Sequence, residues 1–87
     1  MQSNGVIESI SRYIVEKFPL ARKRALKSTD LLLENGILDS MGIFDLVEFI
    51  ETEFGIRIED DDLLPENFQS VERIASFVES RRLRAEV

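Results

Sequence analysis

Apolar residues recur at three- and four-residue spacing in three stretches of this 87-residue chain, at about residues 4–18, 40–54 and 71–84. Such spacing gathers side chains on one face of an α-helix. The repeating positions are Val6, Ile7, Ile10, Tyr13, Ile14 and Phe18, then Ile43, Leu46, Val47, Ile50 and Phe54, then Val71, Ile74, Ala75 and Val78. The pattern predicts an all-α bundle with three long helices.

Turn-forming residues separate these helices. Pro19 ends the first helix, which Ser3 or Asn4 can cap, and Gly55 ends the second. A long connection, residues 19–39, separates the first two helices and has room for a helical turn at about 21–26. Its Asn35–Gly36 pair is a turn signal, and Leu32, Leu33, Ile37 and Leu38 are expected to pack on the core. Residues 60–68 are expected to form one brief helix or turn with Pro65 at the start of a helical turn, and Ser70 can cap the last helix.

Length and composition narrow the class of protein. Eighty-seven residues suffice for one domain, so we expect a single domain over residues 1–87 with its core at about 4–84. The longest apolar run, Leu31–Leu33, is too short for a membrane span, so no membrane insertion is expected. The start shows no signal-peptide pattern, and the chain has no cysteine. These features fit a cytoplasmic protein, and the short length with a methionine start favours a free-standing one.

Charge is distributed unevenly. Residues 30–72 contain 13 acidic residues and one basic residue, Arg57, which gives −12, whereas the rest of the chain carries ten basic and four acidic residues, or +6. The acidic stretch argues against a nucleic-acid surface and favours a partner protein with a basic surface. Solubility alone is the simpler explanation.

The chain lacks the residues that a catalytic serine at position 40 or a calcium loop at position 60 would require. Ser40 stands just before the second helical stretch, but a serine nucleophile needs a base, and the chain has no histidine. A calcium loop starting at Asp60 would place Leu64 and Pro65 where an oxygen ligand and a glycine belong. We therefore expect neither an enzyme nor a metal site. The ordinary role of a serine at this position is to cap the helix.

The second helical stretch has two distinct faces. At about 100° per residue, its repeating apolar positions form a core face, while Asp45, Glu48 and Thr52 lie opposite and Glu51 lies at the edge. Met41 and Phe44 fall outside the core face. Either the preceding connection covers them, or they are exposed anchors of an acidic docking surface beside Ser40.

The segment ENGILDSMGIFDLVEFIETEFGIRI resembles the modification segment of the acyl carrier protein family, whose signature is Asp-Ser followed by Leu or Met at the start of the second helix. The likeness extends across nearly the whole chain. It implies a four-helix bundle, with three longer helices and one short one, that carries 4′-phosphopantetheine on Ser40. The cofactor's thiol would hold an acyl or aminoacyl group as a thioester, which explains how a chain without cysteine could serve thioester chemistry.

The resemblance also implies partners. A phosphopantetheinyl transferase would supply the group from coenzyme A, and an acyl- or aminoacyl-activating ligase, synthase or transferase would use the carrier. We expect these enzymes to dock through the residues around the serine: Asp39, Met41, Phe44, Asp45, Glu48 and Glu51. A monomer is expected. The alternative is an unmodified acidic helical module that binds other proteins.

Three departures from the family pattern concern the pathway. Gly42 stands where many fatty-acid carriers have an acid, and Glu48 where many have an exposed apolar residue. The chain also lacks the paired glycines typical before the serine of peptide-synthetase carriers. These features resemble specialised, free-standing carriers that serve a dedicated ligase or a secondary pathway, and fatty-acid, polyketide and other secondary-metabolite biosynthesis all stay open.

Overall fold

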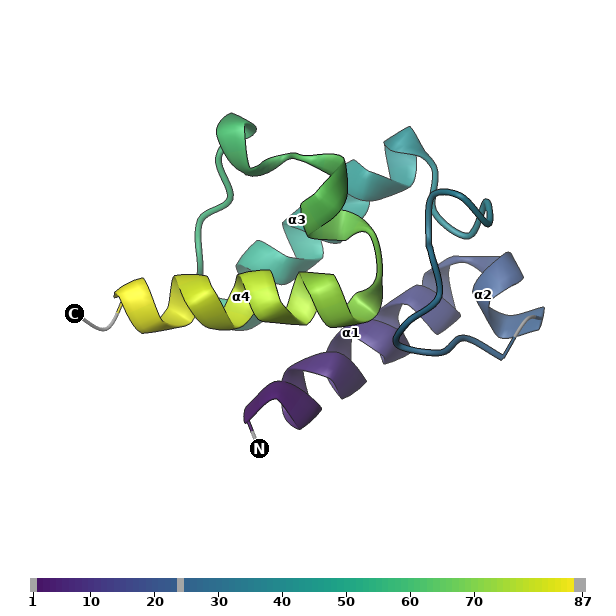
Figure 1. The fold of residues 1–87 in the computed structure, drawn as a ribbon, viewed down its shortest axis with the longest axis horizontal. Helices are drawn as coiled ribbons and strands as arrows, with labels where there is room; N and C mark the ends of the chain where they lie inside the picture. The colour runs from purple at the N-terminus through teal and green to yellow at the C-terminus, as the bar shows by residue number, and fades with distance from the viewer. Residues whose placement is uncertain (1, 24, 86–87) are drawn as a thin grey trace.

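A computed structural model describes the backbone of residues 2–23 and 25–85 and the side chains of residues 5–21, 23 and 25–82. Four α-helices form: α1 (Gln2–Lys17), α2 (Pro19–Lys23), α3 (Ser40–Phe54) and α4 (Val71–Ala85). Two 3₁₀ turns, η1 (Asp60–Asp62) and η2 (Pro65–Phe68), lie between α3 and α4 (Figure 1). No strand occurs in the described backbone, so the all-α prediction is confirmed.

The short α-helix, α2, begins directly at Pro19 and overlaps the helical turn expected at about residues 21–26. Residues 60–68, where one brief helix or turn was expected, form two 3₁₀ turns. Phe18 separates α1 from α2 because a residue before proline is pushed out of helical geometry. Pro65 begins η2, as predicted. The expected caps of α1, Ser3 and Asn4, fall outside the described side chains.

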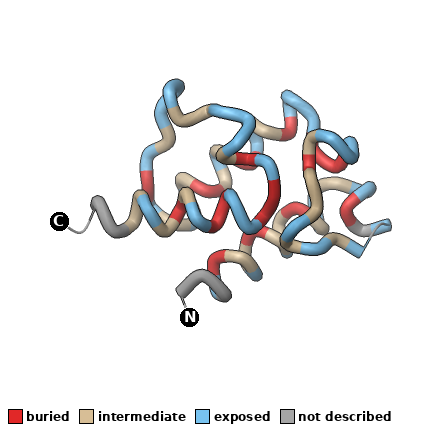
Figure 2. The backbone as a smooth tube through the Cα atoms, viewed as in Figure 1, coloured by how far each residue is buried: buried red, intermediate tan, exposed pale blue. Residues whose placement is uncertain are grey.

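The core lies where α1, α3, α4 and the long connection meet (Figure 2). Each long helix contributes buried residues at helical spacing, such as Ile10, Leu46 and Ile74, all fully buried. The connection contributes Leu32, Ile37 and Leu38, each at most 3% exposed, as its apolar pattern predicted. Nothing in the described part of the chain is a helix both long and apolar enough to cross a membrane.

The connection before α3 is fixed at several points. The Leu32 N–H donates to the Gln69 carbonyl across 2.9 Å, and the Glu72 N–H donates to the Ser28 carbonyl across 3.0 Å. Gly36 adopts a φ of 73°, a conformation that glycine reaches without steric cost, and so confirms the predicted turn. The connection therefore delivers the chain to α3 in a defined position.

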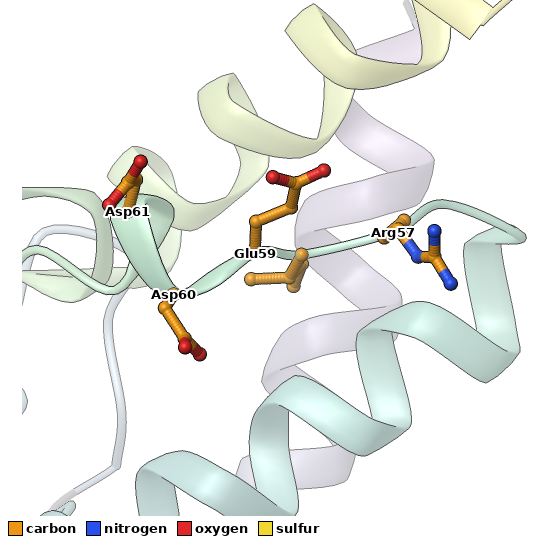
Figure 3. Close-up of a pocket in the computed structure, with 5 residues that line it drawn as sticks. Arg57, Glu59, Asp60 and Asp61 are labelled. Atoms are coloured by element: carbon orange, nitrogen blue, oxygen red, sulfur yellow. The ribbon is translucent and has the colours of Figure 1, made fainter.

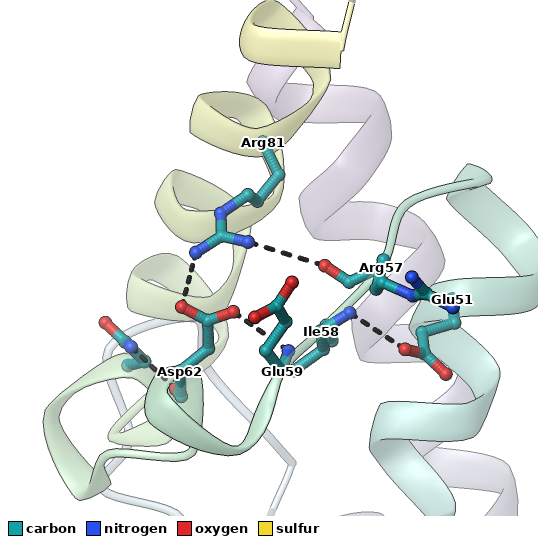
Figure 4. Close-up of polar contacts among 7 residues, drawn as sticks. Glu51, Arg57, Ile58, Glu59, Asp62 and Arg81 are labelled. Carbon is teal, nitrogen blue, oxygen red and sulfur yellow. Dashed lines mark hydrogen bonds and ion pairs between the residues drawn. The ribbon is translucent and has the colours of Figure 1, made fainter.

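The connection after α3 is held just as firmly (Figure 4). Gly55 ends α3 with a φ of 65°, as predicted. The Ile58 N–H donates to a Glu51 carboxylate oxygen across 2.8 Å, and Arg81 on α4 pairs with Asp62. The Arg81 guanidinium also lies 5.1 Å from the Phe77 ring centre. Arg81 thus joins η1 to α4.

The start of α4 follows the sequence expectation. The Ser70 hydroxyl accepts a hydrogen bond from the Arg73 N–H across 3.2 Å, which is the geometry of an N-cap. Ser70 is a buried polar residue, at 5% exposure. Its hydrogen bond satisfies a helix N–H that would otherwise be unpaired.

Candidate functional site

Ser40 is the first residue of α3 and is exposed. The N-cap is Asp39, whose carboxylate accepts a hydrogen bond from the Gly42 N–H across 2.7 Å while its carbonyl accepts one from the Ile43 N–H across 3.0 Å. The capping role that the sequence left open for Ser40 is therefore wrong. Because Asp39 supplies the cap, the Ser40 hydroxyl is free of any partner within the described part of the molecule.

Ile37 and Leu38, the two residues before the exposed cap Asp39, are buried and hydrogen-bonded. Leu38 is 1% exposed, and its N–H donates to the Leu32 carbonyl across 3.1 Å. The Ile37 N–H donates to the same carbonyl across 2.9 Å. The exposed Asp39 and Ser40 thus follow directly on a buried, hydrogen-bonded segment.

The outward face of α3 combines acidic and large apolar side chains. Met41 is 73% exposed and Phe44 is 60% exposed, so the connection before α3 does not cover them. Asp45 and Glu48 are exposed on the same helix, as predicted. We call these four residues the outward face of α3. Glu51, the other acid predicted for docking, is half-buried and binds the Ile58 N–H, so its carboxylate already has a structural role.

The inward face of α3 is centred on Leu46 and Ile50, both fully buried. Ile43, Val47 and Phe54 were assigned to the core face and are partly buried at its edges. Phe49, which was not among the predicted core positions of α3, stacks on Tyr13 of α1 with ring centres 4.2 Å apart. Its position three residues after Leu46 was the available signal for this contact.

Tyr13 joins α1 to the middle of α3. Its hydroxyl donates to the Asp45 carbonyl across 3.2 Å. Burial raises the pKa of the Tyr13 phenol above its ordinary value of 10.0, and the nearby Asp45 and Glu48 carboxylates raise this pKa further. Tyr13 therefore stays neutral and holds the backbone under the outward face of α3.

A polar hollow of about 480 Å³ lies at the connection that leaves the C-terminal end of α3 (Figure 3). It is lined by Arg57, Ile58, Glu59, Asp60 and Asp61. The labelled side chains point in different directions and do not converge on one point (Figure 3). Across the described residues, no group of three or more histidine, cysteine, aspartate or glutamate side chains is placed to hold a metal ion.

The fold and the site together define a small helical protein that presents a serine at the start of a helix. A scan against models of protein families gave no match. Among curated proteins, the chain is similar to "Probable acyl carrier protein PigG" of Serratia sp. (strain ATCC 39006). The two are 36% identical over 73 residues, which cover 84% of this chain and 82% of that protein.

This similarity is high enough and long enough to show the family: the chain belongs to the acyl carrier protein family. Members of this family carry acyl groups for biosynthetic enzymes and do not catalyse reactions themselves. The family uses phosphopantetheine as its prosthetic group. The resemblance seen in the sequence is thus confirmed, together with the carrier function and the helical bundle.

Proposed function

We propose that Ser40 is the residue to which 4′-phosphopantetheine is attached, within one carrier domain over residues 1–87. The observation that carries the proposal is the geometry of the α3 start: Ser40 is exposed while Asp39 takes the cap. A serine that capped its own helix would have to give up a hydrogen bond before reacting. The Ser40 hydroxyl has no such hydrogen bond with any residue that the structure describes.

The residues at the start of α3 fit such a group. The N–H groups of Ser40 and Met41 have no acceptor in the described part of the chain, as is usual in the first turn of a helix. Unpaired N–H groups and the positive end of the helix dipole favour a phosphodiester there. When bound, the group supplies the thiol that this cysteine-free chain lacks.

The outward face of α3 is our proposed docking surface for partner enzymes. Exposed Met41 and Phe44 offer apolar anchors, and exposed Asp45 and Glu48 offer negative charge to a basic surface. Asp39 contributes by holding the first turn through its cap. Glu51 contributes less than the sequence suggested because its carboxylate binds Ile58.

The partners in this proposal are a phosphopantetheinyl transferase and an acyl- or aminoacyl-activating ligase, synthase or transferase. We further propose a free-standing, monomeric carrier in the cytoplasm that serves a specialised pathway. Glu48 supports this choice, since an exposed acid replaces the apolar residue of many fatty-acid carriers. The absence of cysteine from the chain fits the proposed cytoplasmic location.

Intact mass separates this proposal from an unmodified interaction module. The chain is incubated with coenzyme A and a phosphopantetheinyl transferase of broad specificity, and its mass is then measured. We expect a gain of one phosphopantetheinyl group. An unchanged mass, with a known carrier modified in the same reaction, would favour the interaction module. Loading the modified chain with candidate ligases then identifies the cargo.

A further inference from the structure

Gly42 lies in the first turn of α3, two residues after Ser40, and it is buried. A Cβ atom at this position would lie 2.7 Å from Cε1 and 3.0 Å from Cζ of the Phe18 ring, and 3.0 Å from Cδ1 of Leu38. Distances below 3.0 Å force neighbouring atoms to move. The Phe18 ring therefore packs directly on the backbone of the first turn of α3, and only glycine permits this approach.

Phe18 is itself held in place from α1. It is the residue between α1 and α2, and its N–H donates to the Ile14 carbonyl across 2.9 Å. Its ring meets the Tyr13 ring edge-on, with centres 6.4 Å apart. Tyr13 in turn stacks on Phe49 of α3 and donates to the Asp45 carbonyl. The ring against Gly42 thus belongs to an aromatic row that spans from α1 to α3.

The backbone of Gly42 is fixed from a second direction. Its N–H donates to the Asp39 carboxylate, so the cap and the Phe18 ring both act on the same residue. Buried Leu38 also lies within reach of the Cβ position. Ser40 lies between Leu38 and Gly42, and both of these neighbours are immobilised by packing.

We infer that Phe18 and Gly42 form a positioning pair that sets how α3 presents Ser40 to a modifying enzyme. The inference rests on the proposed function, because it assumes that Ser40 is the residue modified. The inference also bears on the observation that Gly42 stands where many fatty-acid carriers have an acid. An acidic side chain here would point at the Phe18 ring, so the glycine does not remove a charge from the outward face of α3.

The test uses reciprocal variants of the full chain. Gly42→Ala places a methyl group against the ring, Phe18→Leu removes the two ring atoms that it would meet, and the double variant combines both changes. Gly5→Ala is the matched control, because Gly5 lies in α1 with nothing within 4 Å of its Cβ position. Transferase kinetics are measured at a temperature where circular dichroism shows every variant folded.

We expect Gly42→Ala to lower kcat for modification substantially, by up to about 100-fold, which is the loss that a misplacement of 1 Å can cause. KM should change little, since the outward face of α3 is intact. The double variant should be modified faster than Gly42→Ala alone, and Gly5→Ala should match the parental chain. Parental kcat in a folded Gly42→Ala variant, or no recovery in the double variant, would overturn the inference.

Hydrogen exchange gives a second measurement that does not depend on modification. The Ile43 N–H bonds to the Asp39 carbonyl and so reports on the first turn of α3. Phe18→Leu keeps Gly42 and should accelerate exchange at Ile43, even if Gly42→Ala does not fold. Unchanged exchange at Ile43 in Phe18→Leu would contradict the positioning role. If the parental chain is not modified at all, the proposed function fails, and exchange still tests the pair.

Discussion

The hydroxyl of Tyr13 on α1 donates a hydrogen bond to the backbone carbonyl of Asp45 on α3 across 3.2 Å. This bond fixes the helix from behind while the Asp45 side chain faces outward. One residue thus serves both sides of α3, its backbone in the scaffold and its carboxylate on the proposed docking surface. Changes to the Asp45 side chain leave the bond to Tyr13 available.

Alkaline pH should weaken the fold through Tyr13. Its folded-state pKa is raised above 10.0 by burial and then by Asp45 and Glu48. The stabilising contribution is therefore fully present below pH 10 and is lost as the pH rises through the folded-state pKa. Tyr13→Phe should lose about 0.5–1.5 kcal/mol of unfolding free energy at neutral pH, the usual net value of one hydrogen bond.

Urea unfolding across a pH series measures both effects. Tyr13 is the single tyrosine of the chain. The part of the loss of unfolding free energy at alkaline pH that comes from a tyrosine phenol must therefore be absent in Tyr13→Phe. Lysines also titrate near this range, and comparison of the two proteins removes their common contribution. An equal decline in both proteins would show that Tyr13 does not couple ionisation to folding.

Phe44 and Ile50 should differ sharply when each is replaced by alanine. Phe44 is 60% exposed, so Phe44→Ala should change the unfolding free energy by no more than about 0.5 kcal/mol. Ile50 is fully buried, and Ile50→Ala should cost about 2–5 kcal/mol. Chemical denaturation measures both values. Comparable losses for the two variants would contradict the assignment of Phe44 to the outward face.

If Phe44 is a docking anchor, Phe44→Ala should also raise KM for the transferase. Leu64→Ala is the matched control, since Leu64 is a large apolar residue that is 45% exposed in the connection between α3 and α4. It should leave KM unchanged. If the two substitutions raised KM equally, Phe44 would have no special role in docking the transferase.

The acidic residues of α3 should accelerate association with a basic enzyme. Exposed charges are screened beyond about 10 Å at 0.1 M ionic strength, so their effect must fade as salt rises. Asp45→Lys with Glu48→Lys should slow modification of the chain at low salt, and the gap from the parental rate should narrow at high salt. Circular dichroism confirms folding, because both side chains are exposed.

A second charge reversal separates position from net charge. Asp61→Lys with Glu66→Lys makes the same change in charge at two exposed residues between α3 and α4. These substitutions should slow modification much less than the pair on α3. Equal slowing by both double variants would indicate that only the total charge matters and that α3 is not the docking surface.

The long helices were predictable because their apolar spacing is regular and their ends carry strong signals. Pro19, Gly55 and Ser70 mark boundaries through backbone geometry that depends only on neighbouring residues. The exposure of Phe44 followed from the same periodicity. Local chemistry was sufficient for these features.

Contacts between distant residues were not predictable in this way. Phe49 pairs with Tyr13, and Gly42 meets Phe18, only because α1 and the α1–α2 junction pack against α3. The choice between Asp39 and Ser40 as cap depends on a shift of one residue in the helix start, which apolar periodicity does not resolve. Glu51 was assigned by helical angle alone, and its hydrogen bond to Ile58 depends on how the next connection folds back.

The most direct test of the central claim is to locate the modification by peptide mass spectrometry. The parental chain and Ser40→Ala are each treated with coenzyme A and transferase, digested and sequenced by fragmentation. We expect phosphopantetheine on Ser40 in the parental chain and none anywhere in Ser40→Ala. Ser40→Ala should remain folded, because Asp39 supplies the helix cap. Modification of another serine, or of a folded Ser40→Ala chain, would contradict the account.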